Sequence, residues 1–96
     1  MPTINILFIG DIVGKPGMDL VQTWLPGLIQ KYKADFVIAN AENVADGKGC
    51  TDKEGNQLFD LGVHVLTGGN HTWDKHLSQE YLRKEPKALR PLNYPK

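Results

Sequence analysis

The sequence predicts an α/β fold built on a parallel three-stranded sheet. Three short apolar segments rich in β-branched residues alternate with segments whose apolar residues recur at helical spacing, the order typical of βα repeats. The apolar segments are residues 3–10, 35–40 and 63–67. Because each connection is long enough to hold a crossover helix, we expect the three strands to run parallel.

The first repeat combines a strand with a long helix. Residues 3–10 are almost continuously apolar, which suits a strand buried on both faces of a parallel sheet. A helix is expected over residues 17–33, because seven apolar side chains there fall on one stripe. The stripe consists of Leu20, Val21, Trp24, Leu25, Leu28, Ile29 and Tyr32. Pro26 removes one backbone hydrogen bond from this helix, so we expect a kink or a break there.

The second repeat has a clear helix start and stop. Residues 35–40 form its strand, and the glycine-containing residues 45–50 form a loop. Thr51 and Glu54 have the spacing of a capping box, with Thr51 as the N-cap and Glu54 reaching back. Gly62 is a typical residue at a helix C-terminus, so we expect this helix to end there.

The third repeat begins with the strand of residues 63–67 and continues with a short helix over residues 74–84. The two prolines within residues 89–96 exclude a helix in the tail. A sheet of only three parallel strands leaves its edges open. We therefore expect the chain to be the first part of a larger domain, or to associate with another copy or with the missing C-terminal part.

Composition describes an ordinary soluble domain and excludes several classes of protein. The 96 residues are enough for one small domain, with 41% apolar and 23% charged residues. Eleven basic residues balance eleven acidic ones, so bulk charge gives no support to nucleic-acid binding. The lone Cys50 excludes an internal disulfide, the N-terminus lacks the basic region and long apolar stretch of a signal peptide, and no apolar run has the length of a membrane span. We expect a cytoplasmic protein.

Polar residues follow each of the three predicted strands, where metal-ligand and acid–base side chains gather. Asp11 follows the first strand, Glu42 the second, and Asn70 with His71 the third. The separations are 31 residues from Asp11 to Glu42 and 28 from Glu42 to Asn70, about the length of a βα repeat. Because carboxyl ends of parallel strands form the ligand-binding edge of open α/β sheets, we expect these residues to meet there.

Familiar phosphate-binding motifs do not account for these clusters. Residues 10–16 approach a P-loop but are one residue short, with Pro16 where a hydroxyl is needed. The first turn lacks a Rossmann glycine pattern, and Val13 stands where an aspartyl-phosphate enzyme commonly has a second aspartate. A metal site remains. Carboxylate, amide and imidazole ligands suit manganese, iron, magnesium or zinc, and a carboxylate placed between two such ions can bridge them.

Each residue also has a plainer interpretation when taken alone. Asp11 could be a turn or cap residue, Glu42 a solvated charge, and Asn70 with His71 a capped turn. His64 lies inside a strand, where a structural role is more common than a ligand role. Three clusters at matched strand ends are harder to explain as coincidence, which favours the metal site.

Three blocks of this sequence resemble the calcineurin-like metallophosphoesterases. The blocks are Gly10-Asp11-Ile12-Val13-Gly14, Asn40-Ala41-Glu42-Asn43 and Gly69-Asn70-His71-Thr72-Trp73-Asp74, and the similarity extends to Leu89-Arg90-Pro91 and Asn93-Tyr94-Pro95. More narrowly, they resemble the bacterial YmdB-like branch of small cyclic-nucleotide phosphodiesterases. Val13 and Thr72 depart from the wider superfamily in ways that fit this branch.

The resemblance implies a two-metal centre and assigns its residues. Asp11 would bind the first metal, Glu42 would bridge both, and Asn70 would bind the second. Asn43 would sit beside the site, and His71 would contact the phosphate and protonate or stabilise the leaving oxygen. A hydroxide bridging the two divalent ions would attack the phosphorus of a small phosphodiester, such as 2′,3′-cyclic AMP.

One departure from the family concerns the remaining ligands. The family supplies further histidines from later strands, and neither His64 nor His76 matches those positions. The resemblance therefore implies that residues 1–96 are the N-terminal part of a single metallophosphoesterase domain, which sandwiches two sheets. The competing hypothesis is a non-catalytic α/β module that acts in assembly or binding.

Overall fold

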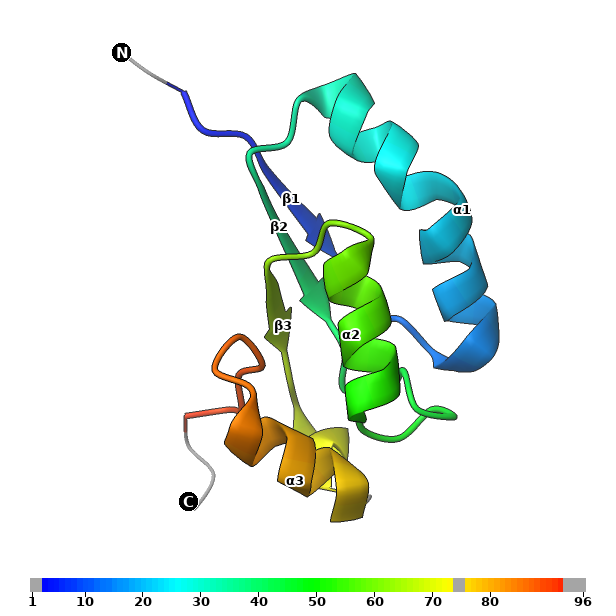
Figure 1. Cartoon of the computed structure of the whole chain (residues 1–96), viewed down its shortest axis with the longest axis vertical. Helices are drawn as coiled ribbons and strands as arrows, with labels where there is room; N and C mark the ends of the chain where they lie inside the picture. The colour runs from blue at the N-terminus through cyan, green and yellow to red at the C-terminus, as the bar shows by residue number, and fades with distance from the viewer. Residues whose placement is uncertain (1–2, 74–75, 93–96) are drawn as a thin grey trace.

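A computed structural model gives the fold of the chain and describes residues 3–73 and 76–92. Strands and helices alternate along it (Figure 1). The elements are β1 (Ile6–Ile9), α1 (Gly14–Tyr32), β2 (Phe36–Asn40), α2 (Asp52–Asp60), β3 (Val65–Thr67), the 3-10 helix η1 (Asn70–Trp73) and α3 (His76–Lys84). The start of the third predicted helix, residues 74–75, and residues 93–96 of the tail lie outside the described residues.

The three strands form one parallel sheet in the order β1-β2-β3. Ile9 is in register with Ala39, and Ala39 with Leu66, so the strands end close to one another. This confirms the predicted α/β class and the parallel three-stranded sheet. The sheet order also brings the polar residues that follow each strand to the same edge.

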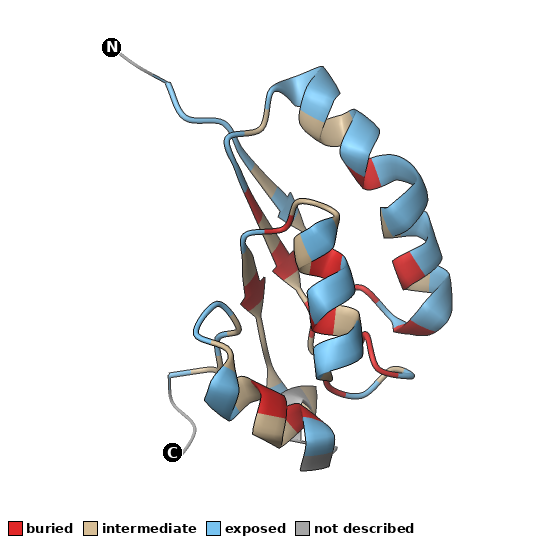
Figure 2. Cartoon of the chain, viewed as in Figure 1, coloured by how far each residue is buried: buried red, intermediate tan, exposed pale blue. Residues whose placement is uncertain are grey.

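The hydrophobic core lies between one face of the sheet and helices α1 and α2. Alternate strand residues point into it, because successive side chains of a strand face opposite sides. The buried core cluster consists of Ile12, Met18, Leu25, Val37, Ala39, Ala41, Val44, Leu58, Val63, Leu66 and Tyr81. Figure 2 shows the buried positions along β2 and β3 and on the sheet-facing sides of the helices.

The expectation that the first strand is buried on both faces was wrong. The strand is shorter than predicted, and Ile6 and Phe8 on β1 are 62% and 57% exposed, as is Ile4 before it at 70%. Leu7 and Ile9 face the core instead. The physical reason is that α1 and α2 pack on one face of the sheet, so the side chains on the far face stay uncovered within the described residues.

Helix α1 differs from its prediction at both its start and its middle. It begins at Gly14 rather than residue 17. Pro16 is tolerated there because it falls in the first turn, where backbone N–H groups have no acceptor within the helix. The helix continues through Pro26, so of the expected kink or break the break does not occur, and the kink stays a prediction. Leu25 is buried as predicted, but Leu20 and Trp24 on the same stripe are exposed, because the stripe is wider than the surface that the sheet covers.

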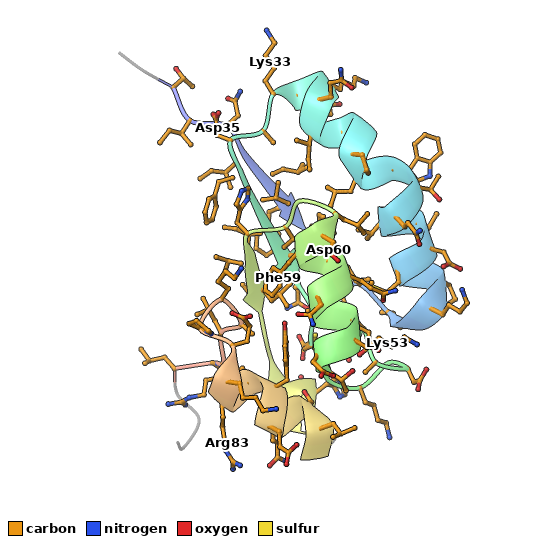
Figure 3. The ribbon with its side chains drawn as sticks, in the orientation of Figure 1. Lys33, Asp35, Lys53, Phe59, Asp60 and Arg83 are labelled. Atoms are coloured by element: carbon orange, nitrogen blue, oxygen red, sulfur yellow. The ribbon has the colours of Figure 1, made fainter. Side chains whose placement is uncertain are left out.

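The turn from α1 to β2 is closed by residues from the segment before β1. Lys33 adopts a left-handed conformation at the end of α1, and the Asn5 side chain donates hydrogen bonds to the backbone carbonyls of Tyr32 and Lys33 at 3.2 and 3.1 Å. The Asp35 carboxylate accepts the Asn5 N–H at 2.9 Å. Figure 3 labels Lys33 and Asp35 on either side of this turn. These bonds satisfy helix-end carbonyls that would otherwise lack partners.

Helix α2 begins and ends close to its predicted limits. The Glu54 carboxylate accepts the backbone N–H of Thr51 at 3.1 Å, the reach-back bond of the predicted capping box. Gly62 follows the helix with a φ of 114°, a conformation that residues with a Cβ rarely adopt. The predicted end of this helix at Gly62 is therefore confirmed, because the backbone there adopts a conformation that favours glycine.

The segment after α3 covers part of the β3 edge. Leu66 donates its N–H to the Lys87 carbonyl and accepts the N–H of Leu89, both at 2.8 Å, which makes a parallel bridge between Leu66 and Ala88. The Lys87 ammonium also lies 4.3 Å from the centre of the Phe59 ring. Residues 87–89 thus extend the sheet's pairing, and the non-helical tail is confirmed for residues 89–92.

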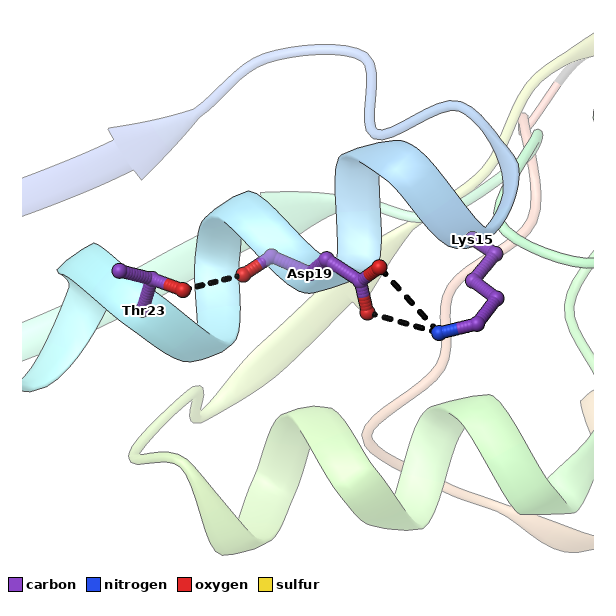
Figure 4. A network of polar contacts seen from close by, with 3 residues as sticks. All are labelled: Lys15, Asp19 and Thr23. Carbon is purple, nitrogen blue, oxygen red and sulfur yellow. Dashed lines mark hydrogen bonds and ion pairs between the residues drawn. The ribbon is translucent and has the colours of Figure 1, made fainter.

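The exposed face of α1 carries an ordinary surface ion pair. Lys15 Nζ lies 3.1 Å from a carboxylate oxygen of Asp19, and Thr23 Oγ1 donates to the Asp19 carbonyl at 2.9 Å (Figure 4). Exposed pairs of this kind contribute little to stability. Within the described part of the chain, no helix combines the length and apolarity needed to cross a bilayer.

His64 has the structural role that the sequence favoured. Its ring Nδ1 accepts the backbone N–H of Val37 at 2.9 Å, and its backbone N–H donates to the Val37 carbonyl at 2.8 Å. Its ring also stacks on Phe36, with the ring centroids 4.9 Å apart. The His64 side chain therefore hydrogen-bonds to the β2 backbone at the residue just before β3 begins.

Replacing His64 by leucine should lower the free energy of unfolding by about 1–3 kcal/mol, because the buried Val37 N–H loses its acceptor. Urea unfolding of the purified chain measures this. His64→Asn is the matched control: its side-chain oxygen keeps an acceptor and should recover part of the loss. Equal stability of the leucine variant and the wild type would contradict the role given to His64.

Candidate functional site

Backbone pairing continues past the strand ends and holds the polar residues at one edge of the sheet. Ile12 donates its N–H to the Asn40 carbonyl at 3.4 Å, and Ala41 donates to the Thr67 carbonyl at 2.9 Å. These bonds tie the segment after β1 to the end of β2, and the segment after β2 to the end of β3. Asp11 immediately precedes Ile12, Glu42 immediately follows Ala41, and Asn70 lies three residues after Thr67.

Asn43 joins the first and second clusters. Its Nδ2 donates to Asp11 Oδ1 at 2.7 Å, and its backbone carbonyl accepts the N–H groups of Gly14 and Gly47, each at 3.0 Å. Asn43 is only 9% exposed, and its Oδ1 is buried without a hydrogen-bond partner among the described residues. The predicted supporting residue therefore holds Asp11 and leaves one buried acceptor atom at the site.

Glu42 joins the second and third clusters. Its Oε2 accepts the backbone N–H of His71 at 3.2 Å, and its Oε1 lies 3.5 Å from the Asn40 amide nitrogen, which donates to it. A carboxylate has about two acceptor directions on each oxygen. The Asn40 and His71 donors therefore orient the group, and a carboxylate oriented from both oxygens suits a position between two cations.

Gly69 lies against the carboxylate of Glu42 and was missed in the sequence analysis. A Cβ placed on Gly69 would overlap both carboxylate oxygens. A side chain at Gly69 would therefore force the Glu42 carboxylate to turn away, and glycine lets the backbone approach the carboxylate in its present position. Asn40, which also contacts Glu42, was quoted only as part of a sequence block. The paired glycines before Asn70 were the one available signal for Gly69.

Some of the predicted site residues are in direct contact in the structure, and Asn70 lies next in the chain to a residue that makes such a contact. Asp11 contacts Asn43, and Glu42 contacts the backbone of His71. Asn70 begins η1, next to His71, and its side chain is exposed. The metal and catalytic roles of Asp11, Glu42, Asn70 and His71 remain predictions.

The residues present fit part of a site for divalent cations. Carboxylate and amide oxygens are hard ligands. Asn43 Oδ1 is a buried acceptor without a hydrogen-bond partner among the described residues, and Gly69 leaves space for the Glu42 carboxylate. Within residues 3–73 and 76–92, no three His, Cys, Asp or Glu side chains are grouped so that they could hold an ion together. The described residues therefore offer two carboxylates and need further ligands for a closed centre.

The single cysteine of the sequence, Cys50, lies at the end of the loop between β2 and α2, where its backbone N–H donates to Ser78 of α3. Burial, with a smaller contribution from the nearby Glu54, raises the pKa of the Cys50 thiol to about 12. Burial also raises the pKa of the neighbouring Tyr81, with smaller contributions from Cys50, Glu85 and Asp52. Both groups stay protonated at neutral pH, which agrees with an incidental cysteine rather than a nucleophile.

Cys50 should react with iodoacetamide at pH 8 at least about 100-fold more slowly than a free cysteine, because only the thiolate attacks and a raised pKa makes it scarce. Intact mass spectrometry over time measures the rate. The same measurement in urea supplies the control, since unfolding should restore an ordinary rate. Fast alkylation of the folded chain would contradict this account of Cys50.

A comparison with models of protein families decides the relationship of the chain. The model described as YmdB-like protein matches residues 7–96. The chain belongs to this YmdB-like family. The match includes all three strand-end clusters, so the resemblance of those blocks to the YmdB-like branch is confirmed.

Known relatives of this family member are named as phosphodiesterases or phosphatases. The chain is 47% identical over 92 residues to a 2′,3′-cyclic-nucleotide 2′-phosphodiesterase of Bacillus subtilis, covering 96% of this chain and 35% of that protein. It is 41% identical over 93 residues to a putative phosphatase/phosphodiesterase of Mycoplasma pneumoniae, covering 97% of this chain and 33% of that protein. The chain thus spans about a third of the length of these relatives.

Solved structures share the fold at similar identity. A crystal structure described as a novel phosphatase from Mycoplasma pneumoniae matches 97% of this chain and 33% of its own, with a TM-score of 0.91 and 41% identity. A hypothetical protein from Thermus thermophilus matches 94% of this chain and 34% of its own, with a TM-score of 0.83 and 42% identity. The arrangement of strands and helices is therefore one that occurs inside longer chains.

Proposed function

We propose that residues 1–96 form the N-terminal part of a single metallophosphoesterase domain, and that the whole protein is a metal-dependent phosphodiesterase. The observation that carries the proposal is the Glu42 carboxylate, fixed by the His71 N–H where the three strand ends meet. The named activity of the Bacillus subtilis relative supports it. The uncovered apolar face of the sheet, with Ile6 and Phe8, supports a larger domain that would cover it.

The proposed centre takes two divalent cations, with iron, manganese, magnesium and zinc as candidates. Asp11 would hold the first cation, Asn70 the second, and Glu42 both, with the remaining ligands supplied by the rest of the protein. When bound, such cations neutralise charge on the phosphate and lower the pKa of water to about 7. The hard oxygen donors of Asp11, Glu42 and Asn70 favour these cations over soft metals such as copper(I).

The residues of this chain would then orient the reacting groups. Asn43 holds the Asp11 carboxylate through its 2.7 Å hydrogen bond to Oδ1, and the other Asp11 oxygen would bind the first cation. Glu42 is oriented from both of its oxygens by Asn40 and His71. The imidazole of His71 would donate a proton to the oxygen that leaves phosphorus, as a general acid.

The proposed substrates are small phosphodiesters, with 2′,3′-cyclic nucleotides the first to be tested. Opening of the cyclic diester breaks one bond between phosphorus and a ribose oxygen, and that oxygen needs the proton that His71 would supply. The alternative of a non-catalytic module predicts that neither metal addition nor His71 substitution changes the rate of hydrolysis.

The test is hydrolysis of 2′,3′-cyclic AMP by the full-length protein, after chelation and again after adding Mn²⁺. Hydrolysis should be lost with chelator, return with the metal, and fall at least about 100-fold in His71→Ala. His64→Asn is the matched control, because His64 lies outside the site and should leave the rate unchanged. Hydrolysis that persists without metal would contradict the proposal.

A further inference from the structure

Ser78 is a buried polar residue of α3 that the proposed chemistry does not use. It is 2% exposed, and its Oγ accepts the backbone N–H of Cys50 at 2.9 Å. Cys50 belongs to the loop between β2 and α2, the loop that also contains Glu42. The bond therefore joins α3 to the loop of the proposed bridging ligand.

Gly49 shows how closely this loop approaches α3 and η1. It has a φ of 75°, and a Cβ placed on it would lie 2.8 Å from Ser78 Oγ and 3.4 Å from the His71 carbonyl oxygen. The N–H of Gly49 donates to the backbone carbonyl of Glu42, and its carbonyl accepts the Ala45 N–H at 2.9 Å. The corner formed by Gly49 and Cys50 is thus bound to Glu42 on one side and to Ser78 on the other.

Hydrogen bonds at the carboxylate and at the backbone of the Glu42 loop consequently join this loop to the elements that follow β3. One runs from the His71 N–H to Glu42 Oε2 at 3.2 Å, and the other from the Cys50 N–H to Ser78 Oγ at 2.9 Å. The first holds the carboxylate itself, and the second holds the corner of Gly49 and Cys50, from which the Gly49 N–H donates to the Glu42 backbone carbonyl. A ligand is held in one geometry only when its supporting groups are held as well.

We propose that Ser78 is a positioning residue of the proposed metal centre. By accepting the Cys50 N–H, it fixes the Glu42 loop against η1 and so sets where the Glu42 carboxylate lies relative to Asn70 and His71. This inference rests on the proposed function, since it assumes that Glu42 binds metal. In this proposal Ser78 contacts neither metal nor substrate, and it acts on Glu42 through the loop.

The experiment measures the Mn²⁺ dissociation constant of the full-length protein by calorimetry at 25 °C, together with the melting temperature of the metal-free protein. Ser78→Ala removes the acceptor for Cys50, so we expect the dissociation constant to rise about tenfold. Thr23→Val is the matched control, because it removes a hydroxyl bonded within α1 at 2.9 Å, and it should bind Mn²⁺ like the wild type.

The outcomes separate this inference from the proposed function. A wild-type protein that binds no Mn²⁺ overturns both. A wild type that binds, with a folded Ser78→Ala variant within twofold of it, overturns the role of Ser78 alone, even if the melting temperature falls. If Ser78→Ala does not fold, Ser78→Cys replaces it. Its sulfur is a weaker acceptor of similar shape, so the dissociation constant should rise about threefold, and an unchanged value would overturn the inference.

Discussion

Replacing Glu42 by glutamine should lower hydrolysis of 2′,3′-cyclic AMP by the metal-loaded full-length protein at least about 100-fold. The variant keeps an oxygen for the His71 N–H, which now lies 3.2 Å from Oε2, so the local fold should survive. It loses the negative charge and the two equivalent oxygens with which Glu42 would hold two cations. We therefore expect the number of tightly bound Mn²⁺ ions per chain to fall as well.

Glu85→Gln is the matched control for the charge. Glu85 accepts the N–H of Lys87 at 2.9 Å in the segment after α3, and glutamine can keep that bond. This variant should hydrolyse the substrate at the wild-type rate. Wild-type activity in Glu42→Gln would contradict the role given to Glu42, whereas equal losses in both variants would point to a general effect of charge.

Gly69→Ala should weaken Mn²⁺ binding by about tenfold or more in the full-length protein. The added methyl group would occupy the space of the Glu42 carboxylate oxygens, so the carboxylate must turn away from its bond to the His71 N–H. Calorimetric titration measures the loss of affinity, and urea unfolding should report a cost of about 1–3 kcal/mol from overpacking.

Gly27→Ala is the control for adding a methyl group to a glycine. A Cβ on Gly27 meets nothing within 4 Å, and the residue lies inside α1, where alanine favours the helix by about 1 kcal/mol. This variant should be as stable as the wild type or more so, with unchanged Mn²⁺ affinity. If Gly69→Ala also binds Mn²⁺ normally, the contact between Gly69 and Glu42 has no bearing on the proposed centre.

The order of elements could be predicted because each was encoded locally. The capping box of Thr51 and Glu54 and the stop at Gly62 lie within a few residues of the helix ends that they define. The start of α1 was harder to locate, because a proline such as Pro16 commonly interrupts a helix. Pro16 is compatible with α1 because it lies in the first turn of that helix. Local signals therefore located the elements better than their exact limits.

The burial of the first strand could not be predicted correctly from its own residues. The apolar run before Asp11 indicates a strand that can be covered on both faces, but covering depends on elements elsewhere in the protein. Ile6 and Phe8 are exposed within the described residues, and the matched relatives are about three times as long as this chain. We expect the longer protein to cover that face of the sheet.

The candidate site was predictable in its residue types and only partly in its contacts. Strand ends of similar spacing identified Asp11 and Glu42, because parallel strands bring their carboxyl ends together. The closeness of Gly69 to Glu42 and the bond from Cys50 to Ser78 depend on how separate loops meet in three dimensions. No spacing rule within a single sequence contains that information.

The most direct test of the proposed centre is a crystal structure of the full-length protein grown with Mn²⁺ and measured for anomalous scattering. Two anomalous peaks should appear at the strand ends, one within ligand distance of Asp11 and one of Asn70, with Glu42 reaching both. Oxygen ligands should lie about 2.0–2.2 Å from the ions, as for other divalent metals of this size. Peaks elsewhere, or none beside Asp11, Glu42 and Asn70, would contradict the assignment.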